Sequence, residues 1–268
     1  MLATMCLRLT VLASGSKGNC AIVASSSTRL LVDAGLSCRE TLKRMAAAGE
    51  DPHGLTAILI SHEHSDHVAG LPVLARKLKL PVYMTGATND TWGRQCGAKQ
   101  THVDRLELFI SGHSFQIGDI QVTPFTIPHD ATDPVAFTFR VDGVKAAIVT
   151  DLGYIPASVC DNIRDCDVLM VESNHDLEML RIGRYPWSVK QRVMSRVGHL
   201  SNAALAEFFS SDYDGGAAFV VLAHLSEENN HPEIARSTAE RALAPRRSLL
   251  HNRLMLASQW QALEAIRL

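Results

Sequence analysis

The sequence predicts an α/β protein built as a four-layer αββα sandwich, in which two mixed sheets pack face to face and helices cover their outer faces. Two observations favour this class. Short apolar runs typical of strands dominate residues 7–60 and again residues 106–150, and each half also contains helical patterns that could cover a sheet. No repeat, low-complexity stretch or Pro/Gly-rich linker divides the chain, so we expect residues 1–268 to form a single domain.

Strands come first in the N-terminal half. They are expected at residues 7–13, 20–24, 29–33, 55–60 and 81–84. The first two flank a small polar loop, SGSKGN, at residues 14–19. Ser37 and Glu40 have the spacing of a capping box, which predicts a helix that ends before Gly49. A second helix is expected at residues 68–78, after a histidine-rich loop.

In the second half, the expected order of strands and helices changes at Asp151. Between residues 106 and 150 strand follows strand, with turns at Gly118-Asp119 and at Asp142-Gly143. Beyond Asp151, helices alternate with strands. Helices are expected near residues 156–163, 188–197, 201–211 and 232–243, and strands at 167–171 and 218–222. Residues 246–268 fit a helix and a strand equally well, and we expect only that they pack against the body.

Composition limits the possible classes without selecting one. A chain of 268 residues, 46% of them hydrophobic, can bury a sizeable core. A net charge of -2 neither indicates nor excludes nucleic-acid binding, because binding depends on local patches. No apolar run reaches the roughly 18 residues of a membrane span, Arg8 interrupts the apolar start, and the six cysteines form no CxxC pair. We therefore expect reduced thiols, no signal peptide, no membrane contact and a cytoplasmic location.

The stretch ISHEHSDHV places three histidines and two acids within residues 62–67, directly after a predicted buried strand. Residues two apart share a face in extended or looped backbone, so His62 and His64 can bind one cation together. Asp66 and His67 then point elsewhere and can serve a second cation. Imidazole and carboxylate ligands suit zinc, and also manganese or iron. The alternative, a dense histidine cluster without a metal, is weaker because the side chains would repel one another when protonated.

Further ligands must come from distant parts of the chain. Three candidates each follow a predicted strand: His129 in IPHD, Asp151 in IVTDLG and His224 in VVLAHLS. Strand ends along one edge of a sandwich converge, which a composite site requires. Taken singly, each would more often be an ordinary loop residue, and only the position at a strand end favours a ligand.

Together with Asp33 in LLVDAG, these residues resemble the five ordered motifs of the metallo-β-lactamase superfamily, whose fold is the αββα sandwich. The segments LASGSKGN, HDATDPVAF, VESNHD, GHLSN and LAHLSEENN resemble the WalJ (YycJ) group of small exonucleases within it. More distantly they resemble transfer-RNA 3′-processing nucleases and phosphodiesterases. The resemblance implies two divalent ions, zinc or manganese, with Asp151 bridging them and Asp33 orienting the metal loop. It assigns the first ion to His62, His64 and His129, and the second to Asp66, His67 and His224.

Two such ions can hold a bridging hydroxide at neutral pH, because metal binding depresses the pKa of water. They can also neutralise charge on a phosphoryl oxygen in the transition state. Asp66 would orient the hydroxide, and His199 in GHLSN is the candidate donor of a proton to the leaving group. Glu172 and His175 in VESNHD could orient or assist His199. A helix-capping role for His199 is an equal alternative.

Fold and metals do not fix the substrate. The loop at residues 14–19 could offer backbone N–H groups to a phosphate, although a tight turn that needs glycine is as common. Its candidate contacts are Ser14, Ser16, Lys17 and Asn19. Residues 179–206 contain five cations and no acid. On a helix from Ser188, the valines at 189, 193 and 197 would face inward, and Arg192 and Arg196 would form a ridge that could follow a phosphate backbone. Solvated surface cations are the alternative.

The sequence thus predicts a metal-dependent hydrolase, most specifically a dinuclear phosphodiesterase that acts on DNA as an exonuclease. The 5′→3′ polarity is implied by the resemblance alone. The short interval between Asp151 and His224 leaves no room for a large inserted domain, which favours action near strand ends. A small-ester or cyclic phosphodiester hydrolase on the same metals remains open. A non-enzymatic metal-binding regulatory protein ranks below both, because no ligand of the pattern is missing.

Overall fold

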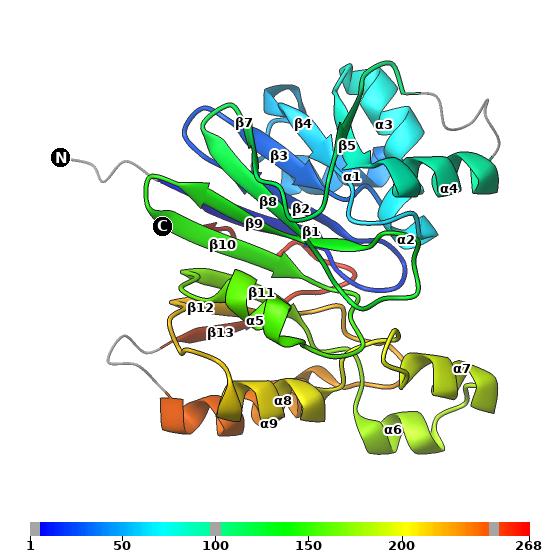
Figure 1. Cartoon of the computed structure of the whole chain (residues 1–268), viewed down its shortest axis with the longest axis vertical. Helices are drawn as coiled ribbons and strands as arrows, with labels where there is room; N and C mark the ends of the chain where they lie inside the picture. The colour runs from blue at the N-terminus through cyan, green and yellow to red at the C-terminus, as the bar shows by residue number, and fades with distance from the viewer. Residues whose placement is uncertain (1–5, 97–102, 247–251) are drawn as a thin grey trace.

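The computed structural model describes residues 6–96, 103–246 and 252–268, which form two mixed sheets of seven strands each (Figure 1). One sheet contains β1 (Arg8–Ala13), β2 (Cys20–Ala24), β3 (Arg29–Val32), β4 (Ala57–Leu59), β5 (Val82–Thr85), β6 (Leu106–Phe109) and β14 (Ile266–Arg267), in the order β14-β1-β2-β3-β4-β5-β6. The other contains β7 (Phe115–Ile117), β8 (Ile120–Thr126), β9 (Val135–Val141), β10 (Val144–Val149), β11 (Val168–Glu172), β12 (Phe219–Ala223) and β13 (Arg253–Leu256), in the order β13-β12-β11-β10-β9-β8-β7.

Helices cover both outer faces of this pair of sheets (Figure 1). On the first sheet lie α1 (Cys38–Ala47), α3 (Leu71–Leu78) and α4 (Gly86–Cys96); on the second lie α5 (Ala157–Ile163), α8 (Asn202–Ser211) and α9 (Pro232–Leu243). The single turn α2 (Ser65–Val68) lies near the sheet edge, and α6 (Leu177–Ile182) and α7 (Trp187–Val193) extend from one end of the second sheet. Short 3-10 turns are η1 (Pro52–Gly54) and η2 (Ala244–Arg246).

Buried apolar side chains fill the three spaces between these four layers. Val11 and Phe137 lie in the core between the sheets, Ile22 and Met45 in the core under α1 and α3, and Phe209 in the core under α8. Central strands such as β1 and β2 are apolar along almost their whole length because both of their faces are covered. The predicted four-layer sandwich is confirmed. Within the described ranges, no helix is both long and apolar enough to cross a bilayer.

The structure corrects three local predictions. The histidine-rich segment is not all loop, because residues 65–68 form the turn α2. Two helices, α4 and α6, were not predicted. The helix expected at residues 188–197 ends at Val193, and Val189 and Val197 are 37% and 44% exposed instead of facing inward.

Strand direction explains why distant residues meet at one edge. Strands β3 to β6 are mutually parallel, as are β10 to β13, and β8 runs in the same direction as β10 because both are antiparallel to β9. The loops after their carboxyl ends therefore gather at one edge, where α/β sheets commonly bind ligands. Asp33, Asp151 and His224, which follow β3, β10 and β12, have φ angles of 60°, 62° and 54°. This left-handed backbone is uncommon for residues with a side chain and often marks a functional site.

Candidate metal centre

Three imidazoles form a cluster at this edge, called here the three-histidine cluster: His62, His64 and His129. His62 and His64 follow β4, and His129 follows β8. His64 Nδ1 lies 3.2 Å from His62 Nε2 and 3.2 Å from His129 Nε2. Burial lowers the pKa of His62 well below its usual 6.5 and also lowers the pKa of His129. Neutral imidazole nitrogens directed at one point fit a divalent cation.

A second group, the carboxylate cluster, contains Asp66, His67, Asp151 and His224. Asp66 and His67 lie on α2, which directs both side chains toward the ends of β10 and β12. His67 Nε2 is 3.3 Å from Asp151 Oδ2, and His224 Nε2 is 3.7 Å from Asp66 Oδ2. Asp151 Oδ2 and His224 Nε2 are buried, and neither has a hydrogen-bond partner among the described residues. A cation bound between them would satisfy both atoms, so this donor set also fits a metal.

Asp33 supports the carboxylate cluster from behind. Its carboxylate lies 2.8 Å from His67 Nδ1 and accepts hydrogen bonds from the backbone N–H and the hydroxyl of Ser61. Burial alone would lower the pKa of His67, but the carboxylates of Asp33, Asp151 and Asp66 outweigh it and raise the pKa well above 6.5. Asp33 therefore lies where the sequence predicted, behind a candidate ligand. Ser61, which also contacts His62 Nδ1 at 3.0 Å, was not predicted although it directly precedes the histidine motif.

Gly35 permits the close packing of this support. A Cβ atom at residue 35 would overlap the carbonyl oxygen of Asp66 and crowd the backbone nitrogen of Asn19. The chain can therefore bring the segment after β3, the turn α2 and the loop after β1 together only with glycine at this position.

Glu172 connects His224 of the carboxylate cluster with a further histidine, His199. Its buried Oε1 lies 2.8 Å from Nδ1 of both His199 and His224, and its Oε2 accepts the backbone N–H groups of Leu152 and Leu200. A carboxylate only accepts, so Nδ1 carries the hydrogen in both rings and each Nε2 is left for another partner. Burial raises the pKa of Glu172, but His199 and His224 outweigh it and hold that pKa at about 2.

His175 lies beside this group rather than within it. The ring is 1% exposed, burial lowers its pKa to about 4, and neither ring nitrogen has a hydrogen-bond partner in the described chain. It lines a recess of about 80 Å³ together with His199, His224 and Asn229. His175 was predicted to orient or assist His199, but no hydrogen bond joins the two rings in the described chain. Asn229, which was not predicted, is also buried with both amide atoms unpartnered.

The loop at residues 14–19 does not form the predicted N–H cradle. Five of its backbone N–H groups are already bound within the protein: Ser14 to Ser258 O, Gly15 to Asn19 Oδ1, Lys17 to Gln259 Oε1, Gly18 to Gly15 O, and Asn19 to Asp66 O. The loop instead supports the metal centre. Asn19 Nδ2 lies 3.0 Å from His67 Nε2 and 3.2 Å from Asp66 Oδ2, and Ser14 Oγ accepts the backbone N–H of His224. Ser16 lines the recess, and Lys17 forms an ion pair with Glu227.

Arg192 and Arg196 do not form the predicted ridge. Arg192 is on α7 and pairs with Asp130, whereas Arg196 lies beyond the end of that helix and stacks on Tyr154 with its guanidinium carbon 4.2 Å from the ring centre. The chain turns back at Gly198, where a Cβ would overlap the carbonyl oxygens of Arg192 and Val193. This turn ends the helix early and brings His199 to the site.

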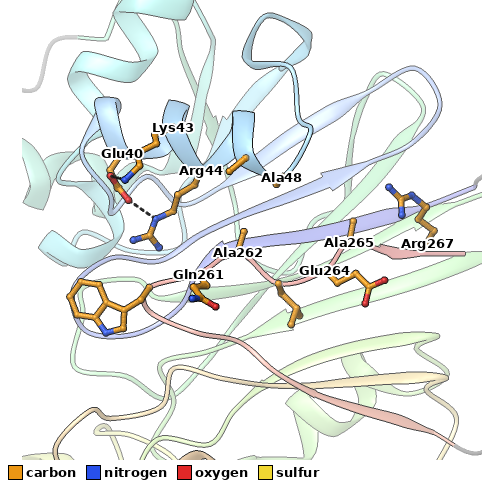
Figure 2. A pocket seen from close by; sticks show the side chains of 12 residues that line it. Glu40, Lys43, Arg44, Ala48, Gln261, Ala262, Glu264, Ala265 and Arg267 are labelled. Carbon is orange, nitrogen blue, oxygen red and sulfur yellow. Dashed lines mark hydrogen bonds and ion pairs between the residues drawn. The ribbon is translucent and has the colours of Figure 1, made fainter.

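A separate hollow of about 530 Å³ lies between α1 and residues 260–267 and is lined by none of the clustered histidines (Figure 2). Figure 2 shows Arg44 paired with Glu40 on its floor. The guanidinium of Arg44 also donates to the carbonyl oxygens of Leu12 and Gln259. The side chain of Gln259 in turn contacts the backbone of Lys17 and Gly18. Arg44, which lines this hollow, is therefore linked through Gln259 to the loop at residues 14–19.

Comparison with known proteins agrees with this geometry. A family model described as "Beta-lactamase superfamily domain" matches residues 28–224. The chain is 41% identical over 239 residues to the exodeoxyribonuclease YycJ of Bacillus anthracis, covering 89% of this chain and 90% of that protein. It is 38% identical over 240 residues to the exodeoxyribonuclease WalJ of Streptococcus pneumoniae serotype 2, covering 88% of each. The metallo-beta-lactamase fold protein YhfI of Bacillus subtilis shares the fold with a TM-score of 0.72 at 18% identity, over 96% of this chain and 99% of that one. The chain belongs to the metallo-β-lactamase superfamily, in its WalJ (YycJ) group.

Proposed function

We propose that this metal-dependent hydrolase is a dinuclear phosphodiesterase that removes nucleotides from DNA in the 5′→3′ direction. The observation that carries the proposal is the buried Asp151 carboxylate, which lies within ion-pair distance of His67 and His224 and whose Oδ2 has no hydrogen-bond partner among the described residues, at the edge where the three-histidine cluster also lies. The names of the relatives, exodeoxyribonucleases, support DNA as the substrate. For a protein with this activity we propose a cytoplasmic location.

We assign one divalent ion, zinc or manganese, to each cluster, with Asp151 shared by both. When bound, two such ions would supply an activated water and would neutralise negative charge on the phosphoryl group. The chain's own groups then have three tasks: to hold the ions, to orient the attacking water, and to return a proton to the leaving oxygen. Asp66 Oδ2, on α2, is the acceptor that would orient the water.

His199 is the proposed proton donor. Glu172 accepts the Nδ1 hydrogen of His199 at 2.8 Å, which fixes the ring and leaves Nε2 as the atom that carries the transferable proton. His199 lines the polar recess, so a leaving oxygen held there could receive this proton. The same carboxylate oxygen fixes His224, so Glu172 positions a metal ligand and the proton donor together.

The substrate contacts are proposed for exposed cations at the rim. Lys17 and Arg192 now pair with Glu227 and Asp130, and each could exchange that carboxylate for a phosphate of the strand. Ser16 lines the recess and could assist, and Arg196, which stacks on Tyr154, is proposed as a further contact. Ser14 and Asn19 are assigned to the support of the metal centre instead of direct phosphate binding.

The test uses protein stripped of metal and reloaded separately with zinc or manganese. It is incubated with duplex DNA labelled at the 5′ end or at the 3′ end, beside the variant Asp66→Ala. We expect early release of the 5′ label as mononucleotide with at least one metal, and none from the variant. Hydrolysis of a small chromogenic phosphodiester without any release from DNA would contradict the DNA assignment and favour a small-molecule hydrolase.

A further inference from the structure

An unusual surface lies beside the recess. Residues 177–197, which we call the α6–α7 segment, expose Ile182 and Trp187 to 73% and 64% of their possible areas. Leu177, Val189, Met194 and Val197 are also exposed. Both helices extend from one end of the molecule, clear of the helices that cover the second sheet (Figure 1). Large apolar side chains gathered on one exposed segment are typical of a binding surface.

The same segment is cationic although the chain carries a net charge of -2. It contains the five cations Arg181, Arg184, Lys190, Arg192 and Arg196 and a single acid, Glu178. Lys190 is buried and donates to the carbonyl oxygen of Arg181, so the four arginines supply the positive charge at the surface. Glu178 is paired with Arg181, while Arg184 is exposed and has no ion pair among the described residues. A surface with this balance attracts a polyanion.

The recess joins this surface to the metal centre. Tyr185 and Val193 of the α6–α7 segment line it together with His199 and His224 of the site. No carboxylate lines the recess. Its walls contain buried polar atoms of His175 and Asn229 that have no hydrogen-bond partner in the described part of the chain, which indicates that the recess receives a polar group.

The recess is too narrow for paired bases. Its volume of about 80 Å³ is that of a few water molecules, and the candidate ligands His62, His67 and Asp151 are buried. A base pair cannot enter this recess, so a strand of a duplex can pass through it only after it has left the complementary strand. Separating the terminal bases requires a surface that replaces the lost base stacking, and exposed apolar or aromatic side chains provide one.

We propose that the α6–α7 segment is a wedge that opens the end of a duplex. Trp187 and Ile182 stack against the terminal base pair, Arg184 contacts the phosphate backbone, and one strand passes Tyr185 to the metal centre. This inference rests on the proposed function, because it names the form of DNA that the site receives.

The test compares the double variant Trp187→Ala/Ile182→Ala with the control Ile110→Ala, which removes a similarly exposed side chain at the end of β6. Each metal-loaded protein is given a blunt duplex, the same labelled strand without its complement, and a small chromogenic phosphodiester. We expect the double variant to raise KM for the duplex by about tenfold or more, since one lost stacking contact has an effect of this size. KM for the unpaired strand should rise less, and the double variant should hydrolyse the small substrate at the wild-type rate. The control variant should match wild type on all three substrates.

A second measurement separates opening from turnover. A duplex with a fluorescent adenine analogue in its terminal pair should brighten on mixing with metal-free wild type and stay dim with the double variant. Equal duplex KM values for both proteins, or equal losses on duplex and small substrate, would overturn the wedge. A wild type that cleaves only the small substrate would instead refute the proposed DNA activity, so the two failures are distinguishable.

Discussion

In the three-histidine cluster the Nδ1 atoms of His62 and His129 contact neutral groups, whereas in the carboxylate cluster the Nδ1 atoms of His67 and His224 contact buried acids. The acid beside His129, Asp130, lies 3.5 Å from its Nε2 and is 24% exposed. His62 Nδ1 is 3.0 Å from the Ser61 hydroxyl, and His129 Nδ1 is 3.2 Å from the carbonyl oxygen of Gly198. In the carboxylate cluster, His67 and His224 lie 2.8 Å from Asp33 and Glu172.

This difference implies unequal ion binding at the two positions. The carboxylate cluster offers two anionic ligands, Asp66 and Asp151, and two histidines whose orientation is fixed by further carboxylates. Apart from the shared Asp151, the three-histidine cluster offers only imidazoles, so Asp66 is the anionic ligand that the carboxylate cluster has in addition. Charge and prior orientation both favour a cation in the carboxylate cluster.

Replacing Asp151 should have the largest effect, because the proposal gives it to both ions. We expect Asp151→Ala to lower kcat for DNA by about three orders of magnitude or more and to reduce metal content, since bound metals contribute several kcal/mol to transition-state stabilisation. Asp142→Ala is the matched control: Asp142 has a similar φ of 48° but lies exposed in the turn between β9 and β10. Similar activity in both variants would show that Asp151 is not a ligand.

Replacing Glu172 should disturb the carboxylate cluster alone. Because one oxygen contacts both His199 and His224, Glu172→Gln should weaken the ion of that cluster by about 10- to 100-fold and leave the three-histidine cluster occupied. Metal titration followed by calorimetry measures both affinities. Glu50→Gln serves as control, because Glu50 is also buried and hydrogen-bonded, to Arg8 and Thr10, but lies away from the site. An equal loss of affinity in the control would attribute the effect to general destabilisation.

Chelation should empty the three-histidine cluster first. We expect the two affinities to differ by at least about tenfold, since even a well-screened pair of unit charges at 4 Å contributes about 1 kcal/mol and the ion carries two charges. Metal content measured against chelator concentration should show two steps. His64→Ala should remove the first step and His224→Ala the second. A single step in which both ions leave together would refute the contrast.

The smallest effect is expected at the rim. Arg192 is 61% exposed and paired with Asp130, and Arg192→Ala should reduce the salt dependence of DNA binding by about 0.9 in the slope of log K against log salt. Arg253→Ala is matched to it, because Arg253 is 59% exposed and paired with Glu264. Unchanged slopes in both variants would remove Arg192 from the substrate contacts.

Much of the fold and the meeting of the distant histidines and acids could be predicted from sequence. His129, Asp151 and His224 each follow a strand, and the carboxyl ends of strands running in one direction share an edge. By contrast, α4 was missed because its sequence, GATNDTWGRQC, contains two glycines and several weak helix formers. Burial of Trp92, which is 1% exposed, stabilises that helix against its local preference.

The support of the site was less predictable because it depends on contacts between segments far apart in the chain. The loop at residues 14–19 has the composition of a phosphate cradle, yet Gln259, more than 200 residues away, occupies the backbone N–H of Lys17. Likewise, the valines near residue 193 have helical spacing, but the helix ends at Val193, the chain turns back on it at Gly198, and both Val189 and Val197 are exposed. The spacing of residues within one segment does not indicate contacts with segments that are distant in the sequence.

The central claim is that two ions of unequal affinity act together in this centre. The most direct test measures metal content and DNA hydrolysis in the same samples, as manganese or zinc is added stepwise to metal-free protein. The account predicts two ions per chain, with little hydrolysis at one ion and a steep rise as the second binds. Full hydrolysis at one ion per chain, or hydrolysis that persists in excess chelator, would contradict it.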